Sequence, residues 1–174
     1  MLHISSGELT CWPGFSLKLE SELSFLPGNS YHLVGNNGSG KSSFITQILL
    51  PLLQKHEANL YRIYVQQLFH IQGFAIKAHA AINKPELKLR SEQDCLIYLL
   101  HNLSEAIVRQ ARPVYLIVDE SLYLPVIYDY LKQFGFPHCL IYSHHGANPL
   151  PTPDHTIAFK PLSANVSSVY ETGL

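Results

Sequence analysis

The chain has 174 residues, 47% of them hydrophobic, which is enough for one well-buried domain and short for two, so we expect residues 1–174 to form a single domain. Charged residues make up only 14% and the net charge is −1, which argues against a polybasic nucleic-acid-binding surface and against an acidic tail. The first residues lack the pattern of a signal peptide, and no apolar run is long enough to cross a bilayer. Any membrane role should therefore come through a partner.

The cysteines and histidines do not form a recognisable metal site. Cys11, Cys95 and Cys139 are far apart and odd in number, as is typical of reduced, buried thiols in an intracellular protein. The ten histidines are scattered, and only His144 and His145 are adjacent. Neighbouring residues of a strand point to opposite faces, so this pair would chelate a metal poorly. We expect neither a disulfide framework nor a zinc site.

The first part of the chain predicts short strands followed by one strand–loop–helix unit. Residues 2–31 show short apolar alternation broken by glycine and proline, which favours antiparallel strands and turns. A strand is expected at 31–34, and a helix is expected after Lys41, kinked or ended by Pro51. Residues 60–65 then predict a strand that ends at Gln66 and Gln67.

The second part alternates helices and strands. A short helix is predicted at 73–84, and a longer one begins at the capping box of Ser91 and Asp94, with a core-facing apolar stripe that continues until Pro113. Residues 114–118 predict a strand buried on both faces; a helix follows with Pro125 in its first turn and Gly135 as its stop, and then a buried strand at 139–142. Two further strands are expected at 156–159 and 166–170. This order predicts an α/β fold with a mainly parallel sheet flanked by helices and a small N-terminal antiparallel portion, and with its ligand at the carboxyl ends of the strands.

Residues 35–42 match the phosphate-binding pattern G-x-x-x-x-G-K-[ST] between a predicted strand and a predicted helix. Glycines let successive backbone N–H groups point at a phosphate chain, and the helix adds its own unpaired amides. Lys41 would reach the β- and γ-phosphates, and the Ser42 hydroxyl would complete the coordination shell of a magnesium ion. The predicted nucleotide-binding residues of this loop are Gly35, Asn36, Asn37, Gly38, Ser39, Gly40, Lys41, Ser42 and Ser43.

A second chemical signal is the acidic pair Asp119-Glu120 at the end of the apolar strand 114–118. Two acids in this position cost desolvation free energy unless a cation meets them, and magnesium would supply that cation. Asp119 would hold the shell of the ion, and Glu120 would act as general base on the attacking water.

The order of these motifs along residues 12–145 resembles the nucleotide-binding domain of ABC-type ATPases, which are P-loop NTPases. The resemblance implies that Trp12 stacks on adenine and that Gln66, or Gln67 in the alternative register, contacts magnesium. It also implies that His144, or His145, is the switch histidine that contacts the γ-phosphate and holds the water and the glutamate in line.

The chain departs from this family in three places. The nearest match to the family's Leu-Ser-Gly-Gly-Gln signature is Leu89-Arg90-Ser91-Glu92-Gln93, which lacks both glycines and brings a carboxylate towards the γ-phosphate. The segment after Glu120 does not match the usual continuation. Only a short segment separates Gln67 from Leu89, so the helical subdomain must be reduced.

The resemblance implies an ATPase that binds ATP and Mg²⁺ as the ATP-binding subunit of an ABC-type system. Its expected partners are a second ATPase subunit, in a homodimer or a heterodimer, and a membrane permease. Its expected location is the cytoplasm, or the inner face of a membrane through that partner. Two alternatives stay open: a P-loop phosphotransferase acting on a small molecule, and a catalytically weak nucleotide-binding scaffold.

Overall fold

The computed structural model describes residues 1–110, 112–134, 137–144 and 152–172. The predicted helix stop at Gly135 and the alternative switch residue His145 lie outside the described residues. Within the described part of the chain, no helix is both long and apolar enough to cross a membrane.

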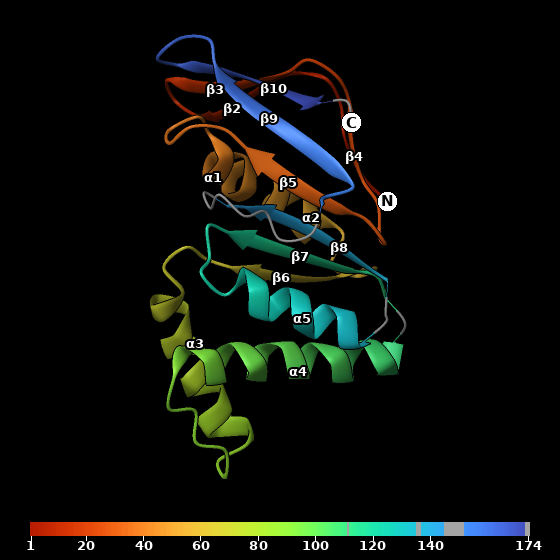
Figure 1. Cartoon of the computed structure of the whole chain (residues 1–174), viewed down its shortest axis with the longest axis vertical. Coiled ribbons are helices and arrows are strands. Elements are labelled where there is room, and N and C mark those ends of the chain that lie inside the picture. The colour runs from red at the N-terminus through yellow and green to blue at the C-terminus, as the bar shows by residue number, and fades with distance from the viewer. Residues whose placement is uncertain (111, 135–136, 145–151, 173–174) are drawn as a thin grey trace.

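The fold is α/β, as predicted, and is organised by one eight-stranded sheet (Figure 1). Its central strands β9, β5, β8, β7 and β6 are mutually parallel, whereas β10 is antiparallel to β9 and β2 is antiparallel to β3. The N-terminal strand β3 also pairs in parallel with β10, so the N-terminal strands extend the main sheet. In spatial order the strands are β2 (Gly7–Trp12), β3 (Phe15–Leu19), β10 (Val166–Thr172), β9 (His155–Pro161), β5 (Ser30–Val34), β8 (His138–Ser143), β7 (Val114–Asp119) and β6 (Tyr61–Val65). A separate antiparallel pair consists of β1 (Leu2–Ile4) and β4 (Leu23–Phe25).

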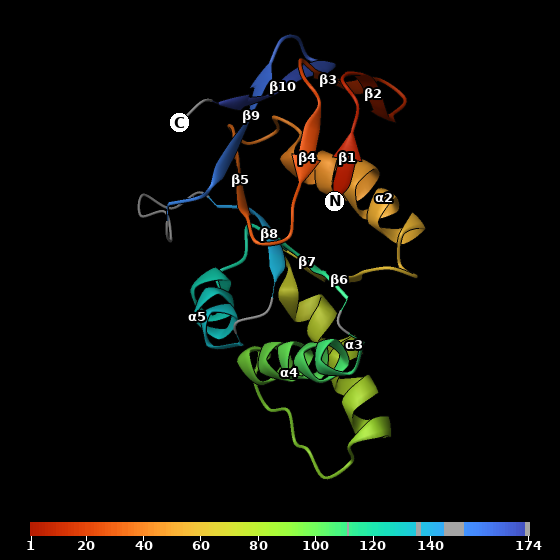
Figure 2. The same ribbon diagram turned by 90° about the vertical axis from the view of Figure 1, so that its right-hand side faces the viewer.

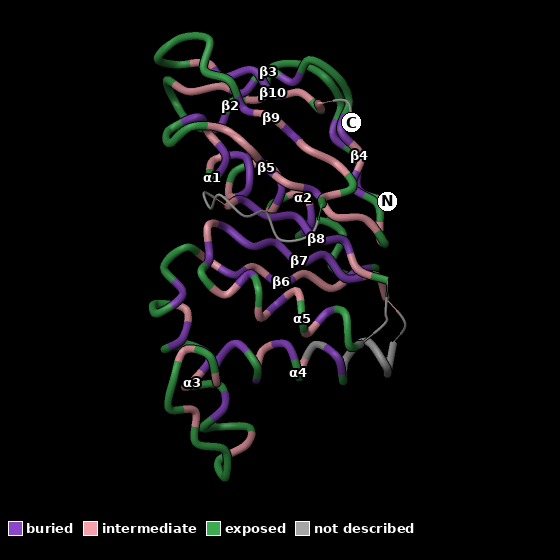
Figure 3. Tube along the Cα trace, viewed as in Figure 1, coloured by how far each residue is buried: buried purple, intermediate pink, exposed green. Residues whose placement is uncertain are grey.

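Helices cover both faces of this sheet, and the alternation of side chains along β7 shows why (Figure 2). Tyr115 and Ile117 belong to the core shared with the helices that follow β5, while Leu116 and Val118 belong to the core shared with the helices of the other face. Because successive side chains of a strand point to opposite faces, the all-apolar strand requires a helical layer on each side. Figure 3 shows the resulting burial of β7 and β8. The helical segments are α1 (Lys41–Ser43), the π-helical η1 (Phe44–Leu49), α2 (Leu50–Lys55), α3 (Phe69–Asn83), α4 (Glu92–Gln110) and α5 (Leu124–Phe134).

Two helix predictions need correction. Of the two outcomes expected at Pro51, a kink or a helix end, the helix end is wrong: Pro51 lies in the first turn of α2, and the chain stays helical to Lys55. The wider π-helical turns of η1 directly precede this proline, which cannot donate the usual hydrogen bond to the carbonyl four residues earlier. Helix α3 begins at Phe69, four residues before the predicted start at Gly73.

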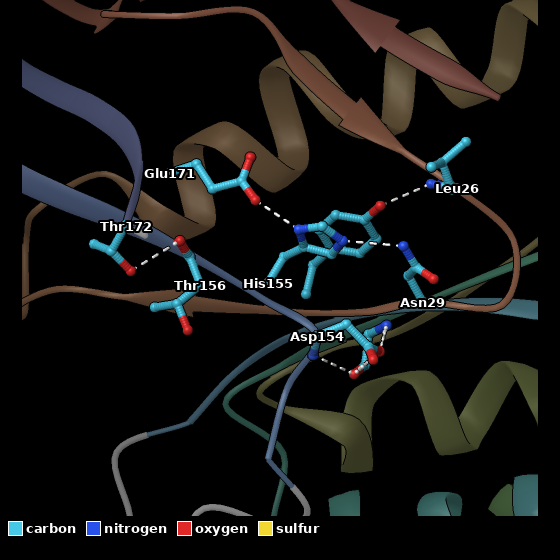
Figure 4. A network of polar contacts seen from close by, with 9 residues as sticks. Leu26, Asn29, Asp154, His155, Thr156, Glu171 and Thr172 are labelled. Carbon is cyan, nitrogen blue, oxygen red and sulfur yellow. Dashed lines mark hydrogen bonds and ion pairs between the residues drawn. The ribbon is translucent and has the colours of Figure 1, made fainter. Parts of the chain in front are cut away.

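A polar network at the amino ends of β5 and β9 holds these strands beside β10 (Figure 4). The Nδ1 atom of His155 is 2.5 Å from Glu171 Oε1, and its Nε2 atom is 3.0 Å from Asn29 Nδ2. The ring also stacks on Tyr31 at a centroid distance of 4.6 Å. Since the Asn29 Nδ2 group donates, Nε2 accepts and Nδ1 carries the proton.

Asp154 closes the same network from the segment that enters β9 (Figure 4). The backbone N–H and the hydroxyl of Ser30 both donate to Asp154 Oδ2 at 2.7 Å, and these bonds lower the pKa of Asp154. The starts of β5 and β9 are therefore fixed relative to one another, and with them the loops at the opposite ends of both strands.

The predicted capping box at the start of α4 is confirmed. Ser91 Oγ accepts a hydrogen bond from the Asp94 backbone N–H at 3.0 Å, and Asp94 Oδ2 accepts hydrogen bonds from the Ser91 and Arg90 backbone N–H groups at 2.8 Å. These bonds, led by the one from the Ser91 N–H, lower the pKa of Asp94.

We predict that Ser91→Ala lowers the free energy of unfolding by about 1 kcal/mol, because the first turn of α4 loses its side-chain acceptor. Ser91→Thr is the control, since it keeps a hydroxyl at the same position. Urea denaturation followed by circular dichroism measures both variants. A Ser91→Ala protein as stable as the wild type would contradict the assignment of this cap.

Candidate functional site

One edge of the sheet collects almost every residue singled out in the sequence. The carboxyl ends of β5, β6, β7, β8 and β9 meet there because these strands are parallel. Strand β2 ends, and β3 and β10 begin, at the same edge because of how they pair with β9 and with one another. In Figure 1 the connecting loops of this edge lie at the left-hand side. The topology thus brings together segments that are more than 100 residues apart in the sequence.

This edge contains a hollow of about 570 Å³, within the range of ligand-binding pockets. Nine of the predicted site residues line it: Trp12, Asn37, Gly38, Ser39, Gly40, Lys41, Ser42, Ser43 and Glu120. Five residues that we did not predict, or did not prefer, also line it: Gly14, Phe15, Gln67, Ala164 and Asn165. Five predicted residues are not among its lining residues: Gly35, Asn36, Gln66, Asp119 and His144.

The loop between β5 and α1 needs glycine at two positions where its backbone passes close to neighbouring strands. At Gly35 (φ 156°), a Cβ atom would lie 2.6 Å from the carbonyl oxygen of Phe159 in β9. At Gly40 (φ 99°), a Cβ atom would lie 2.9 Å from the Phe15 ring and from Leu17. Both φ values also disfavour residues with a side chain. The loop is therefore pressed against β9 at its start and against β3 at its end.

Lys41 carries a buried positive charge at the end of this loop. Only 4% of its side chain is exposed, and its Nζ atom donates to the carbonyl oxygens of Gly35 at 2.8 Å and Asn36 at 3.2 Å. The same Nζ atom is 3.6 Å from Glu120 Oε1. The loop thus curls around the ammonium group and holds it at the wall of the hollow, facing a carboxylate.

Besides Lys41, the residues Gln67 and Ser143 also contact Glu120. Gln67 Nε2 donates to Glu120 Oε2 at 2.9 Å, and the Glu120 backbone N–H lies within 3.1 Å of both the hydroxyl and the carbonyl oxygen of Ser143. Its φ of 47° makes it the only non-glycine residue with positive φ in the described part of the chain. A conformation of this kind persists only where surrounding contacts enforce it, and it turns the carboxylate towards Lys41.

Asp119 is a buried carboxylate that, among the described residues, accepts hydrogen bonds from two neutral hydroxyl groups. It is 3% exposed; Ser143 Oγ donates to its Oδ1 atom at 2.8 Å and the Tyr64 hydroxyl donates to its Oδ2 atom at 3.5 Å. Burial first, and Asp119 second, raise the pKa of Tyr64 to about 12. Among the described residues, no cationic side chain forms an ion pair with Asp119.

Of the adjacent residues Gln66 and Gln67, only Gln67 lines the hollow, and His144 does not line it. Gln67 lines the hollow and contacts Glu120, whereas the Gln66 backbone N–H donates to Gln72 Oε1. Of the two registers that the sequence leaves open, Gln67 is thus the one that lines the hollow. His144 follows directly after β8, where its backbone contacts the ring of His32, whose pKa burial lowers.

Trp12 lies at the aromatic side of the hollow. It stacks on Phe15 with ring centroids 4.9 Å apart and planes inclined by 22°, and it remains 45% exposed. One face of the indole is thus covered, and the residue still presents aromatic surface to the hollow. Phe15 touches both Trp12 and Gly40, so it connects the aromatic side to the glycine-rich loop.

Near the segment Leu89–Gln93, the two acids that follow Arg90, namely Glu92 and Asp94, both accept hydrogen bonds from other groups of the chain. The Tyr123 hydroxyl donates to Glu92 Oε2 at 2.8 Å, so this carboxylate bonds within its own chain. The Asp94 carboxylate already occupies the backbone N–H groups of Arg90 and Ser91. The backbone N–H groups of Arg90, Ser91 and Asp94 at the start of α4 therefore already have acceptors within the chain.

Sequence reasoning missed Phe15, Ala164 and Asn165 as lining residues, and missed Tyr64 and Ser143 as partners of the acidic pair. Ser143 could have been found, because it directly follows the predicted buried strand 139–142; in the structure it is the last residue of β8 and pairs with Asp119. Nothing in the local sequence marks Asn165, which reaches the hollow through the pairing of β10 with β3.

No protein-family model matches this chain, and no curated protein sequence matches it.

We predict that Gly35→Ala destabilises the protein more than Gly38→Ala does. Both glycines have positive φ, but an added Cβ at Gly38 meets nothing within 4 Å, whereas at Gly35 it meets a backbone carbonyl. The expected losses in unfolding free energy are about 1–2 kcal/mol for Gly38→Ala, from conformation alone, and about 1–3 kcal/mol more for Gly35→Ala. Equal losses by urea denaturation would contradict the close approach of this loop to β9.

Proposed function

We propose that the hollow binds Mg-ATP, that residues 35–42 form a P-loop, and that the protein is an ATPase of the ABC type. The observation that carries the proposal is that Lys41, buried at the end of the glycine-rich loop, lies in one hollow with both Trp12 and Glu120. A cation among backbone amides suits phosphate, an exposed indole suits a base, and a carboxylate suits an attacking water. A single small pocket with these three properties matches a nucleoside triphosphate.

Hydrolysis would proceed by in-line displacement at the γ-phosphorus. The oxygen of a water molecule forms a bond to phosphorus while the bond to the β,γ-bridging oxygen breaks, and ADP leaves with the electron pair. The Glu120 carboxylate accepts the proton of the attacking water. Lys41 stabilises negative charge on the phosphates, for which it would exchange its contacts with Glu120 and the loop carbonyls. His144, which directly follows β8, would contact the γ-phosphate, as the family resemblance implies.

The available oxygen groups fit magnesium. Asp119 is buried with no cationic partner among the described residues, and it directly precedes Glu120, which lines the hollow together with Ser42, so a carboxylate and a hydroxyl would hold the ion beside the proposed phosphates. Gln67 replaces Gln66 as the proposed amide ligand. No group of three or more His, Cys, Asp or Glu residues suited to a metal occurs in the described ranges, and a magnesium ion shared with phosphates needs no such group. Bound magnesium would neutralise charge on the phosphates.

Nucleotide-dependent association with a second ATPase subunit and coupling to a membrane permease belong to the same proposal. Apolar side chains exposed along α3, namely Ile71, Phe74 and Ile82, support the presence of a partner protein. A second candidate is a nucleotide-binding protein with weak turnover. The occupied donors at the start of α4 favour it, because this is where the family carries its signature.

We predict that Lys41→Met weakens Mg-ATP binding about tenfold to hundredfold, because a charge-assisted hydrogen bond to phosphate is lost while the aliphatic stem is kept. Isothermal titration calorimetry with ATP and Mg²⁺ measures the affinity. The matched control is Lys55→Met, an exposed lysine at the end of α2, which should bind ATP like the wild type. Equal affinities for all three proteins would refute the P-loop assignment.

We also predict that Glu120→Gln lowers ATP turnover at least about a hundredfold, because the amide cannot accept the proton of water. Its affinity for Mg-ATP should be kept or increased, since Lys41 loses a competing carboxylate. Phosphate release assays on the wild type and the variant measure turnover. If the wild type binds ATP tightly and Glu120→Gln leaves a low turnover unchanged, the second candidate replaces the first.

A further inference from the structure

The turn between β9 and β10 contributes two residues to the hollow, Ala164 and Asn165. No motif in the sequence points to this turn. It lines the hollow together with Trp12, the last residue of β2, and Phe15, the first residue of β3, which flank the turn between these strands. Figure 1 shows both turns at the same edge of the sheet as the loop between β5 and α1.

The order of the strands defines where Asn165 lies within the hollow. Across the shared edge, β2 and β3 come first, then β10 and β9, then β5, and only then β8, β7 and β6. The β9–β10 turn therefore lies on the same side of the glycine-rich loop as the aromatic pair. Glu120 and Gln67, at the ends of β7 and β6, lie on the other side of that loop. Asn165 consequently belongs to the side of the hollow where a base would lie if phosphate occupies the loop.

The backbone of Asn165 is fixed on both sides of the residue. Its N–H donates to Ser163 Oγ at 3.3 Å, and its carbonyl oxygen accepts from the Ser16 N–H at 2.9 Å, next to Phe15. The first paired residues of β10 and β3 are Val166 and Ser16, which anchor the turn to the strand that carries Phe15. Within the described residues, none hydrogen-bonds to the carboxamide of Asn165, and the residue lines the hollow, so its donor and its acceptor are available to a ligand bound there.

We propose that Asn165 recognises the base of the bound nucleotide and selects a purine with a 6-amino group, that is, adenine. This inference rests on the proposed function. The carboxamide oxygen accepts a hydrogen bond from the amino group, and the carboxamide nitrogen donates to an adjacent ring nitrogen, a pairing that asparagine commonly makes with adenine. The stacked rings of Trp12 and Phe15 supply an aromatic surface for the two-ring base, and Asn165 reads its edge.

The test is a cycle of two changes, one in the protein and one in the ligand. Calorimetry measures the affinities of wild type and Asn165→Ala for ATP, for purine riboside triphosphate, which lacks the amino group, and for inorganic triphosphate. The wild type should bind ATP about three- to tenfold more tightly than purine riboside triphosphate. Asn165→Ala should bind these two nucleotides alike, with an unchanged affinity for inorganic triphosphate. Asn59→Ala, an exposed asparagine outside the hollow, is the matched control and should behave like the wild type.

The outcomes separate this inference from the proposed function. If the wild type and Asn165→Ala show the same preference for ATP over purine riboside triphosphate, Asn165 does not read the base, although nucleotide binding stands. If Asn165→Ala loses affinity equally for all three ligands, the residue shapes the hollow and does not recognise the amino group. If the wild type binds neither ATP nor inorganic triphosphate, the proposed function and the inference both fail.

Discussion

The buried ammonium group of Lys41 is the constraint on which the rest of the site depends. A lysine that is 4% exposed must find negative partners, and here they are two loop carbonyls and the carboxylate of Glu120. The carbonyls can converge only because Gly35 lets the loop pass against β9. Glu120 can reach Nζ only because its strained backbone is held by Ser143. One buried charge thus links β5, β7, β8 and β9.

The same contacts explain how an anion could enter. Each present partner of Lys41 is replaceable: a phosphate can take over from Glu120, and Gln67 can hold the displaced carboxylate. Phe15 packs against both Trp12 and Gly40. A phosphate bound to the loop and a base stacked on Trp12 would therefore both press on this ring. We infer that the phosphate and base sides of the hollow act as one binding site.

Most of the fold follows from local sequence. The apolar run at β7 and the capping box of α4 specify their elements because the signal lies within a few residues. It is harder to predict which of two adjacent residues after a strand faces the ligand, because this depends on the backbone beyond the last strand residue; the adjacent pair Gln66 and Gln67 therefore leaves the register open. Asn165 could not be predicted, since its position depends on β10 pairing with β3, about 150 residues away in the chain.

The central claim is that Lys41 binds a phosphate group, and that without nucleotide the Glu120 carboxylate occupies the position of that phosphate beside Nζ. A crystal structure of the protein with Mg²⁺ and a non-hydrolysable ATP analogue tests it most directly. The account predicts the triphosphate on the backbone of the loop between β5 and α1, within hydrogen-bonding distance of Lys41 Nζ, the Glu120 carboxylate turned away from Nζ, and the base at Trp12. An analogue bound elsewhere, or a hollow in which Lys41 still contacts Glu120 at saturating analogue, would contradict it.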